Sequence, residues 1–313
     1  MPASGSTMAA SCAISPGASS CSCAITRESA CRPGVRAERV VVPRGGLSRE
    51  VGARLRGLLR RSHGSIGRDT AGHRSNCRSR SGDVALEGIG ADGKAQKRTS
   101  LSHGWGVRYS YTGHDFHGLA LGPDGRLYFS IGDRGARIVD KKTGKVLIDL
   151  PDEGGVFRCE PDGSNLELVM RGLRNPQELA FDDYGNLFTA DNDSDQGDRE
   201  RFVYVVQGAD AGWRVGWQHH PIGKEHNPWL AEAMWEPRSE KNKQPASVLS
   251  PIMNIPDGPS GVAYYPGTGL PKEYEGHFFV WGFKGSTAKS NINTWTVRPQ
   301  GAYFAVDETP SEF

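Results

Sequence analysis

The residues best suited to chemistry lie in the second part of the chain. His114 stands just before a predicted β-hairpin, and Asp133 lies in the loop at the far end of that hairpin. Because a strand pair brings its two outer ends together, these side chains are expected to meet. A carboxylate beside an imidazole fixes its tautomer and raises its basicity, which suits a general base. A purely structural His–Asp pair is the commoner outcome of such a pattern.

A second candidate is the segment Gly-Leu-Arg-Asn-Pro-Gln at 172–177, in which Arg174 and Asn175 precede a predicted strand. The guanidinium of arginine offers five donors in a fixed plane, which suits the oxygens of a carboxylate or a quinone. The alternative is a connecting turn with Arg174 on the surface.

The third candidate is an acidic run over residues 191–198. Its oxygen-bearing side chains are of the kind that Ca²⁺ prefers. The predicted ligands are Asp191, Asn192, Asp193, Asp195 and Asp198. The glutamate and the helices of an EF-hand are absent from the pattern, so we reject that motif. A solvated acidic turn is the alternative.

Short apolar runs between turn residues would position these groups. Apolar residues alternate at period two over residues 117–133, around a Pro-Asp-Gly turn at 123–125. The same pattern recurs sixty positions later over residues 179–193, and another hairpin is predicted over residues 156–169.

Repeated hairpins without an intervening helical pattern predict an all-β architecture, and specifically a β-propeller, whose blades take roughly 40–50 residues each. Residues 101–313 would then form a partial propeller, an incomplete ring of about four blades. We expect truncation at the C-terminus, because no closing strand is evident before Phe313.

Residues 1–100 differ sharply from the rest. They contain no Phe, Trp or Tyr and carry 17 basic and 7 acidic residues, whereas the remaining residues carry 21 basic and 29 acidic. This low-complexity basic segment, rich in Arg, Ser and Gly, is predicted to be disordered or irregular, because it cannot bury enough apolar surface. A basic amphipathic helix over residues 47–62 is the one local exception. A misassigned or out-of-frame start would also explain the abrupt boundary.

Several classes of function find no support in the composition. The six cysteines show neither zinc-site spacing nor a dense disulfide framework. No apolar run is long enough to span a membrane, and no signal peptide is visible. No aromatic residue is interleaved with the basic residues of the first part, which argues against nucleic-acid binding.

Taken together, several motifs resemble one known family, the soluble PQQ-dependent glucose dehydrogenases and sorbosone dehydrogenase-like propellers. The motifs are His114, GPDGRLYFSIGDRG at 122–135, GLRNPQELAF at 172–181, the acidic loop that ends in Gly-Trp at 212–213, and the segment at 261–280. Related propellers belong to membrane-associated bacterial dehydrogenases that often carry a c-type haem domain. The likeness covers residues 105–313.

The resemblance implies a six-bladed propeller with PQQ on its axis. His114 would take the proton of the substrate hydroxyl while a hydride passes to the quinone, and Asp133 would hold His114. Arg174 and Asn175 would contact the quinone, with Gln177 beside them.

Two further roles are implied by the same resemblance. Lys284 would reach a PQQ carboxylate, and the acidic run would occupy the place of the family's Ca²⁺ loop. The implied function is a PQQ- and Ca²⁺-dependent oxidoreductase acting on a sugar or alcohol hydroxyl, although an open ring could leave this chain inactive. Family resemblance alone implies a periplasmic or secreted location and a c-type haem electron acceptor on another domain or protein.

The sequence also departs from that family. Glu178 replaces the glycine that usually follows Pro-Gln, and the acidic run holds more aspartates than the family's loop. No C-x-x-C-H motif for a c-type haem occurs. Two other functions therefore stay open at this point, a Ca²⁺-dependent propeller lactonase and a non-catalytic propeller scaffold.

Overall fold

The computed structural model describes residues 95–106, 113–218, 227–238, 248–307 and 309–313, together with four strands that precede them. These strands are β1 (Met8–Ala13), β2 (Ser22–Arg27), β3 (Arg74–Ser79) and β4 (Gly82–Ile89). The helix predicted over residues 47–62 lies outside the described residues, and the disorder predicted for residues 1–100 stays a prediction.

The described part is almost entirely β-sheet, as the period-two pattern predicts. The first large sheet contains β6 (Phe116–Leu121), β7 (Leu127–Ile131), β10 (Gly154–Cys159), β11 (Glu167–Leu173) and β15 (Ala209–Asp210). Its first four strands form an antiparallel meander, and β15 adds to β11 in parallel. The predicted hairpins over residues 117–133 and 156–169 are therefore confirmed as β6–β7 and β10–β11.

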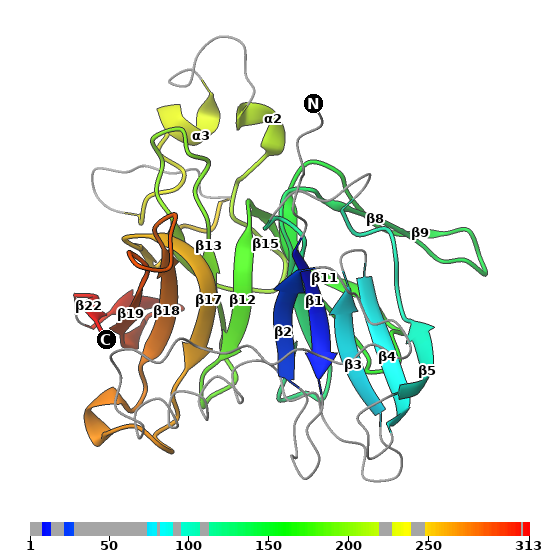
Figure 1. Ribbon diagram of the computed structural model, residues 1–313. Coiled ribbons are helices and arrows are strands. Elements are labelled where there is room, and N and C mark those ends of the chain that lie inside the picture. Colours follow the sequence, from blue (N-terminus) through cyan, green and yellow to red (C-terminus); the bar gives the residue numbers. More distant parts are fainter. Residues whose placement is uncertain are drawn as a thin grey trace, which may run out of the picture.

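Two further sheets repeat this arrangement. The second contains β12 (Pro176–Phe181), β13 (Leu187–Asp191), β14 (Arg201–Tyr204) and β16 (Met253–Asn254). The third contains β17 (Gly258–Tyr264), β18 (Phe278–Phe283), β19 (Asn291–Trp295) and β22 (Ser311–Glu312). Both are antiparallel meanders, and Figure 1 shows β12 and β17 side by side as their first strands.

The sheets pack face to face, which is the propeller-like arrangement that the hairpin repeats predict. Leu179 and Leu187 face the first sheet, whereas their neighbours Ala180 and Phe188 face the third. Since successive side chains of a strand point to opposite faces, the middle sheet is apolar on both sides. The described sheets do not close into a ring.

The positions of the blade-like sheets differ from the expected four blades within residues 101–313. Among the residues that the structure describes, 113–313 hold three four-stranded meanders, and the one other described sheet of more than two strands is β3-β4-β5, with β5 at Ala95–Ser100. Residues inserted within and between the meanders account for the shift. A two-stranded arm, β8 (Ala136–Val139) and β9 (Val146–Leu150), interrupts the first meander, and β20 (Val297–Gln300) and β21 (Tyr303–Val306) interrupt the third.

A long connection between β14 and β16 carries the helical turns. They are α2 (Val215–Gln218) and α3 (Pro228–Ala231), and a 3-10 turn, η2 (Lys272–Tyr274), follows in the third sheet. In Figure 1, α2 and α3 lie beyond one end of the strands. None of the helices in the described parts of the chain has the length and apolar character needed to cross a membrane.

A β-bulge occurs at the third residue of β6 and again of β12. Gly118 and Glu178 both have a φ of +61°, in the left-handed region that favours glycine, and the strand register shifts at each site. Thr189 Oγ1 donates a hydrogen bond of 2.7 Å to Glu178 O. The departure from the family's glycine, noted in the sequence, therefore falls on a strained backbone position.

Replacing Glu178 by glycine is expected to stabilise the protein. The left-handed conformation costs a non-glycine residue about 1–2 kcal/mol, and the extra entropy of glycine offsets about 0.5–1 kcal/mol of that gain. Thermal unfolding should therefore shift upward by about 1–3 °C. Gly118→Ala at the equivalent bulge is the control and should destabilise, because its Cβ would lie 2.9 Å from Leu179 Cγ. A lower melting temperature for Glu178→Gly would contradict the assignment of strain.

Candidate functional site

One end of the three sheets gathers the predicted site residues. The strand register pairs Phe116 with Ile131 and Pro176 with Asp191, so residues just before β6 and β12 lie beside residues at or after the ends of β7 and β13. Gly258 and Phe283 pair in the same way in the third sheet. His114, Asp133, Arg174, Asn175 and the acidic run consequently share this end.

His114 and Asp133 meet as the hairpin ends predict. His114 Nδ1 lies 2.9 Å from Asp133 Oδ1, and because an ionised carboxylate can only accept, the imidazole donates from Nδ1. The other carboxylate oxygen, Oδ2, accepts a hydrogen bond of 3.1 Å from the indole Nε1 of Trp213. The aspartate side chain is 6% exposed and that of His114 is 18% exposed. The imidazole of His114 is therefore partly exposed, and it donates its hydrogen bond to a buried carboxylate.

Gly132 lets this pair approach Asn175 closely. A Cβ at Gly132 would lie 2.9 Å from Asn175 Oδ1 and 3.0 Å from His114 O. The backbone N–H of Asp133 donates a hydrogen bond of 2.6 Å to Arg174 O. The first and second sheets are thus joined at the site by backbone contacts.

Arg174 and Asn175 are held by Asp191 through their backbone. The N–H groups of Arg174 and Asn175 donate to Asp191 Oδ1 over 3.1 and 2.7 Å. Both residues are buried, so Arg174 is not the surface residue of a connecting turn. The buried side-chain atoms Arg174 Nε, Arg174 Nη1 and Asn175 Oδ1 have no hydrogen-bond partner in the described part of the chain. Arg174 Nη2 lies 3.7 Å from the carboxylate of the exposed Asp195.

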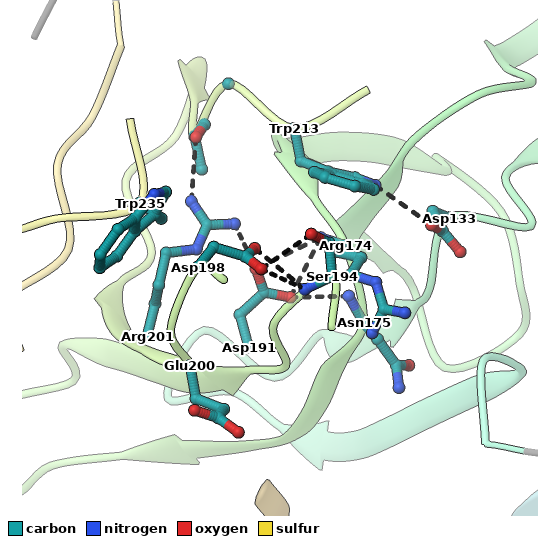
Figure 2. Close-up of polar contacts among 12 residues, drawn as sticks. Asp133, Arg174, Asn175, Asp191, Ser194, Asp198, Glu200, Arg201, Trp213 and Trp235 are labelled. Atoms are coloured by element: carbon teal, nitrogen blue, oxygen red, sulfur yellow. Dashed lines mark hydrogen bonds and ion pairs between the residues drawn. The ribbon is translucent and has the colours of Figure 1, made fainter. Parts of the chain in front are cut away.

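A buried network of charged and polar side chains holds Asp191, the residue that binds this backbone. Arg201 forms an ion pair with Asp191, donates 3.0 Å to Ala211 O, and places its guanidinium carbon 4.5 Å from the ring centre of Trp229. Trp229 Nε1 in turn donates 2.7 Å to Asp198. Figure 2 shows Arg174 and Asn175 between this network on one side and the Asp133–Trp213 pair on the other.

The acidic run supplies fewer open oxygens than its composition predicts. Asp191 is the last residue of β13 and not part of the following loop, and its carboxylate binds Arg201 and two backbone amides. Asp198 accepts bonds from Ser194 N, Ser194 Oγ and Trp229. These two carboxylates therefore do not fit a Ca²⁺ site in this conformation. Among the described residues no group of three or more His, Cys, Asp or Glu side chains is arranged to hold a metal ion.

Burial, and after it the charges of neighbouring carboxylates, shift the pKa of two acidic residues in and beside this loop. Burial, with the nearby charges of Glu200, Asp198 and Asp195, raises the pKa of Asp193 to about 7, and Arg174 opposes this shift. Burial and the charges of Asp198, Asp257 and Asp195 likewise raise the pKa of Glu200. The predicted Ca²⁺ site now depends on Asn192, Asp193 and Asp195 with backbone carbonyls, and stays a prediction.

Gln177 and Lys284 lie at the same end but contact other groups. Gln177 Nε2 donates 2.8 Å to Gly113 O and thereby anchors the backbone next to His114. Lys284 Nζ lies 3.2 Å from Asp257, and its side chain is 40% exposed. The structure therefore brings His114, Asp133, Arg174 and Asn175 together, whereas Lys284 pairs with Asp257 near the acidic loop.

Two residues of the site, Arg201 and Trp213, were not predicted from the sequence to contact the candidate residues. Arg201 is an arginine among the apolar residues of β14, and charged residues are almost never fully buried unless paired. An arginine within an apolar strand could have indicated a buried ion pair, but it could not have identified the acidic residue of that pair. Trp213 was noted only as part of a Gly-Trp motif, and its contact with Asp133 spans 80 positions.

The raised pKa of Asp193 predicts that stability depends on pH. The ordinary carboxyl pKa is 3.8, so the protonated side chain stabilises the fold fully below that pH, and this contribution is lost as the pH rises through about 7. Asp193→Asn should therefore be about 1 kcal/mol more stable than wild type at pH 8, a value reduced for solvent screening. The difference between the two proteins should be smaller at pH 5.

Urea unfolding at pH 5 and pH 8 checks this expectation. Asp307→Asn removes an exposed carboxylate that pairs with Arg298, and serves as the control that should follow wild type at both values. A constant difference between Asp193→Asn and wild type across this range would contradict the raised pKa.

Comparison with known proteins adds a family and a set of folds. Residues 84–313 match a family described as a domain of unknown function, DUF7133. The match begins inside the segment that we predicted to be a separate basic region. No curated protein matches the chain.

Several solved structures are similar to the chain. The PQQ-bound aldose sugar dehydrogenase of Streptomyces coelicolor is 20% identical, with a TM-score of 0.46 over 77% of this chain and 61% of that one. An oxidoreductase assigned as a glucose dehydrogenase from Thermus thermophilus is 19% identical, with a TM-score of 0.48 over 74% and 61%. The PQQ domain of pyranose dehydrogenase from Coprinopsis cinerea is 12% identical, with a TM-score of 0.33 over 76% and 78%. The chain spans about three fifths of the length of the first two.

Proposed function

The chain belongs to the DUF7133 family, and we propose that this member is a PQQ-dependent oxidoreductase that oxidises a hydroxyl group of a sugar or alcohol. The observation that carries the proposal is the side chain of Arg174. It is buried, and two of its donor nitrogens have no hydrogen-bond partner among the residues that the structure describes. Leaving charged donors unsatisfied is costly, so such a group calls for an anionic or strongly accepting ligand.

The donors and acceptors present fit a planar cofactor that carries carboxylates and carbonyls. Arg174 Nε and Nη1 can donate in the plane of the guanidinium, which suits paired oxygens. Asn175 Oδ1 adds an acceptor that none of the described residues uses, and its amide can turn to donate instead. PQQ presents both kinds of oxygen, and when bound it would supply the quinone that accepts a hydride.

His114 and Asp133 supply the proton chemistry of the proposed reaction. His114 donates from Nδ1 to Asp133, so its Nε2 carries the lone pair that takes the proton of the substrate hydroxyl. The hydride leaves the same carbinol carbon, and a carbonyl product results. The carboxylate of Asp133 stabilises the imidazolium that forms and holds its orientation, as carboxylate partners of catalytic histidines do.

Calcium enters the proposal only as a predicted cofactor. Since Asp191 and Asp198 are engaged with other groups, no step of the mechanism depends on a metal ion. A cation bound near Asp193 and Glu200 would relieve their mutual repulsion. The substrate, an electron acceptor of the c-type haem kind and a periplasmic or secreted location likewise remain proposals.

PQQ titration of the full chain tests the function. We expect saturable binding, followed by visible absorbance and calorimetry, and sugar- or alcohol-dependent bleaching of an artificial electron acceptor by the loaded protein. Titrations with Ca²⁺ and with a chelator decide the calcium prediction separately. Absence of PQQ binding would overturn the proposal and leave the lactonase or the scaffold, which a lactone-hydrolysis assay distinguishes.

A further inference from the structure

We propose that Trp213 is a positioning residue that orients the Asp133 carboxylate and thereby fixes the tautomer of His114. As a statement about catalysis this rests on the proposed function, but the orientation itself is a property of the protein without cofactor. It concerns a residue 80 positions from Asp133 in the sequence.

Both oxygens of the Asp133 carboxylate are occupied by different elements. Oδ1 accepts from His114 Nδ1 at 2.9 Å, and Oδ2 accepts from Trp213 Nε1 at 3.1 Å. Indole nitrogen can only donate, so it can satisfy a carboxylate and cannot exchange roles with the imidazole. With one oxygen tied to the indole, rotation of the carboxylate would break a buried hydrogen bond. The plane of the carboxylate is therefore fixed. As a result, Oδ1 stays in position to accept the hydrogen bond from His114.

The fold holds Trp213 rigidly enough to perform this task. Trp213 is 1% exposed, and its backbone N–H donates a hydrogen bond of 2.9 Å to Gly172 O. The preceding residue, Gly212, has a φ of +92°, in the left-handed region that favours glycine. The indole packs edge-on against Trp229 with ring centres 5.3 Å apart. Burial, the backbone hydrogen bond and the ring contact therefore hold the indole in place beside Asp133.

Fixing Asp133 has a direct consequence for the imidazole. A neutral histidine carries its proton on either nitrogen, and a hydrogen-bond acceptor at Nδ1 selects the tautomer whose Nε2 has the lone pair. If the carboxylate rotates away, this selection is lost and part of the population carries the proton on Nε2. Such molecules cannot accept the substrate proton. Trp213 thus acts through Asp133 and needs no contact with the substrate.

Nitrogen-15 NMR of histidine-labelled full-length protein without cofactor tests the inference. In wild type we expect His114 signals of the tautomer protonated at Nδ1, and in Trp213→Phe a shift toward the averaged values of a mobile imidazole. Trp105→Phe is the matched control, because it removes a buried indole donor from Ser102 in the core of the first sheet, where the ring contacts neither Trp213 nor His114 in any ring pair or hydrogen bond of the described residues. Its His114 signals should match wild type. Equal shifts in both variants would mean loss of aromatic packing and would overturn the inference.

A second variant keeps the test valid if Trp213→Phe does not fold. Asp133→Asn leaves the indole in place and should move the Trp213 Nε1–H proton resonance upfield, because a neutral amide is a weaker acceptor than a carboxylate. An unmoved resonance would overturn the inference. If the loaded enzyme is active, Trp213→Phe should lower kcat about tenfold, as expected for loss of one charge-assisted hydrogen bond, with KM little changed. The NMR result stands whether or not PQQ binds, so the two proposals can fail separately.

Discussion

Arg174→Met is expected to weaken PQQ binding at least about hundredfold, because two charge-assisted hydrogen bonds of about 1.5–3 kcal/mol each would be lost. The same change should raise the free energy of unfolding of the cofactor-free protein, because it removes buried charged donors that the described residues leave unsatisfied, whereas the lost ion pair with the exposed Asp195 is long and worth little. Calorimetric titration with PQQ and urea unfolding measure the two quantities on the same samples.

The two effects separate a ligand-binding arginine from a structural one. Arg158 donates to Glu167, Tyr128 and Gln207 in the first sheet, so its donors are already used within the protein. Arg158→Met should therefore lower stability and leave PQQ affinity unchanged. If Arg174→Met instead destabilised the apo protein and bound PQQ as wild type does, the guanidinium would be a structural element and the proposed function would lose its main support.

The largest effect on stability is expected for Arg201→Met. Arg201 and Asp191 are fully buried and form an ion pair, so removal of the cation leaves an uncompensated charge that costs about 3–5 kcal/mol. Asp191 also holds the backbone N–H groups of Arg174 and Asn175, and the loss should reach the site. Urea unfolding gives the energy, and PQQ titration of the folded fraction gives the effect on the site.

A double substitution shows whether the stability lost in Arg201→Met comes from the unpaired buried charge or from the smaller side-chain volume. Arg201→Met combined with Asp191→Asn removes both charges, keeps a side-chain oxygen for the backbone N–H groups of Arg174 and Asn175, and should recover part of the stability that Arg201→Met alone loses. Arg137→Met breaks an ion pair with Asp149 that is about half exposed on both sides, and should cost less than about 1 kcal/mol. If Arg137→Met and Arg201→Met lowered the free energy of unfolding by equal amounts, the buried ion pair would contribute no more to stability than the exposed one.

Local patterns in the sequence determined the strands that carry the site. The Pro-Asp-Gly turn at 123–125 and its counterpart sixty positions later predict β6–β7 and β12–β13, because turn residues and period-two alternation act over a few neighbouring positions. The contact of His114 with Asp133 follows from the same hairpin. Arg174 and Asn175 were likewise found from their place before a strand.

The number of residues between blades could not be predicted in this way. The β8–β9 arm and the connection that carries α2 and α3 have turn and apolar residues of the same kinds as the blades, and only pairing across the sheets separates them. Four blades of average length therefore fitted residues 101–313 as well as three meanders with insertions do.

The chemical state of the site was decided by tertiary structure. By spacing, Asp191 and Asp198 are as suitable for Ca²⁺ as Asp193 is, yet Arg201, Trp229 and backbone amides take up their oxygens. The sequence by itself determined the hairpins, the His114–Asp133 pair and the position of Arg174. Only the tertiary structure decided which carboxylates are engaged, which donors stay unsatisfied among the described residues, and that Trp213 reaches Asp133. Such partners come from loops far apart in the chain, and their competition for one carboxylate depends on distance and burial that no local pattern encodes.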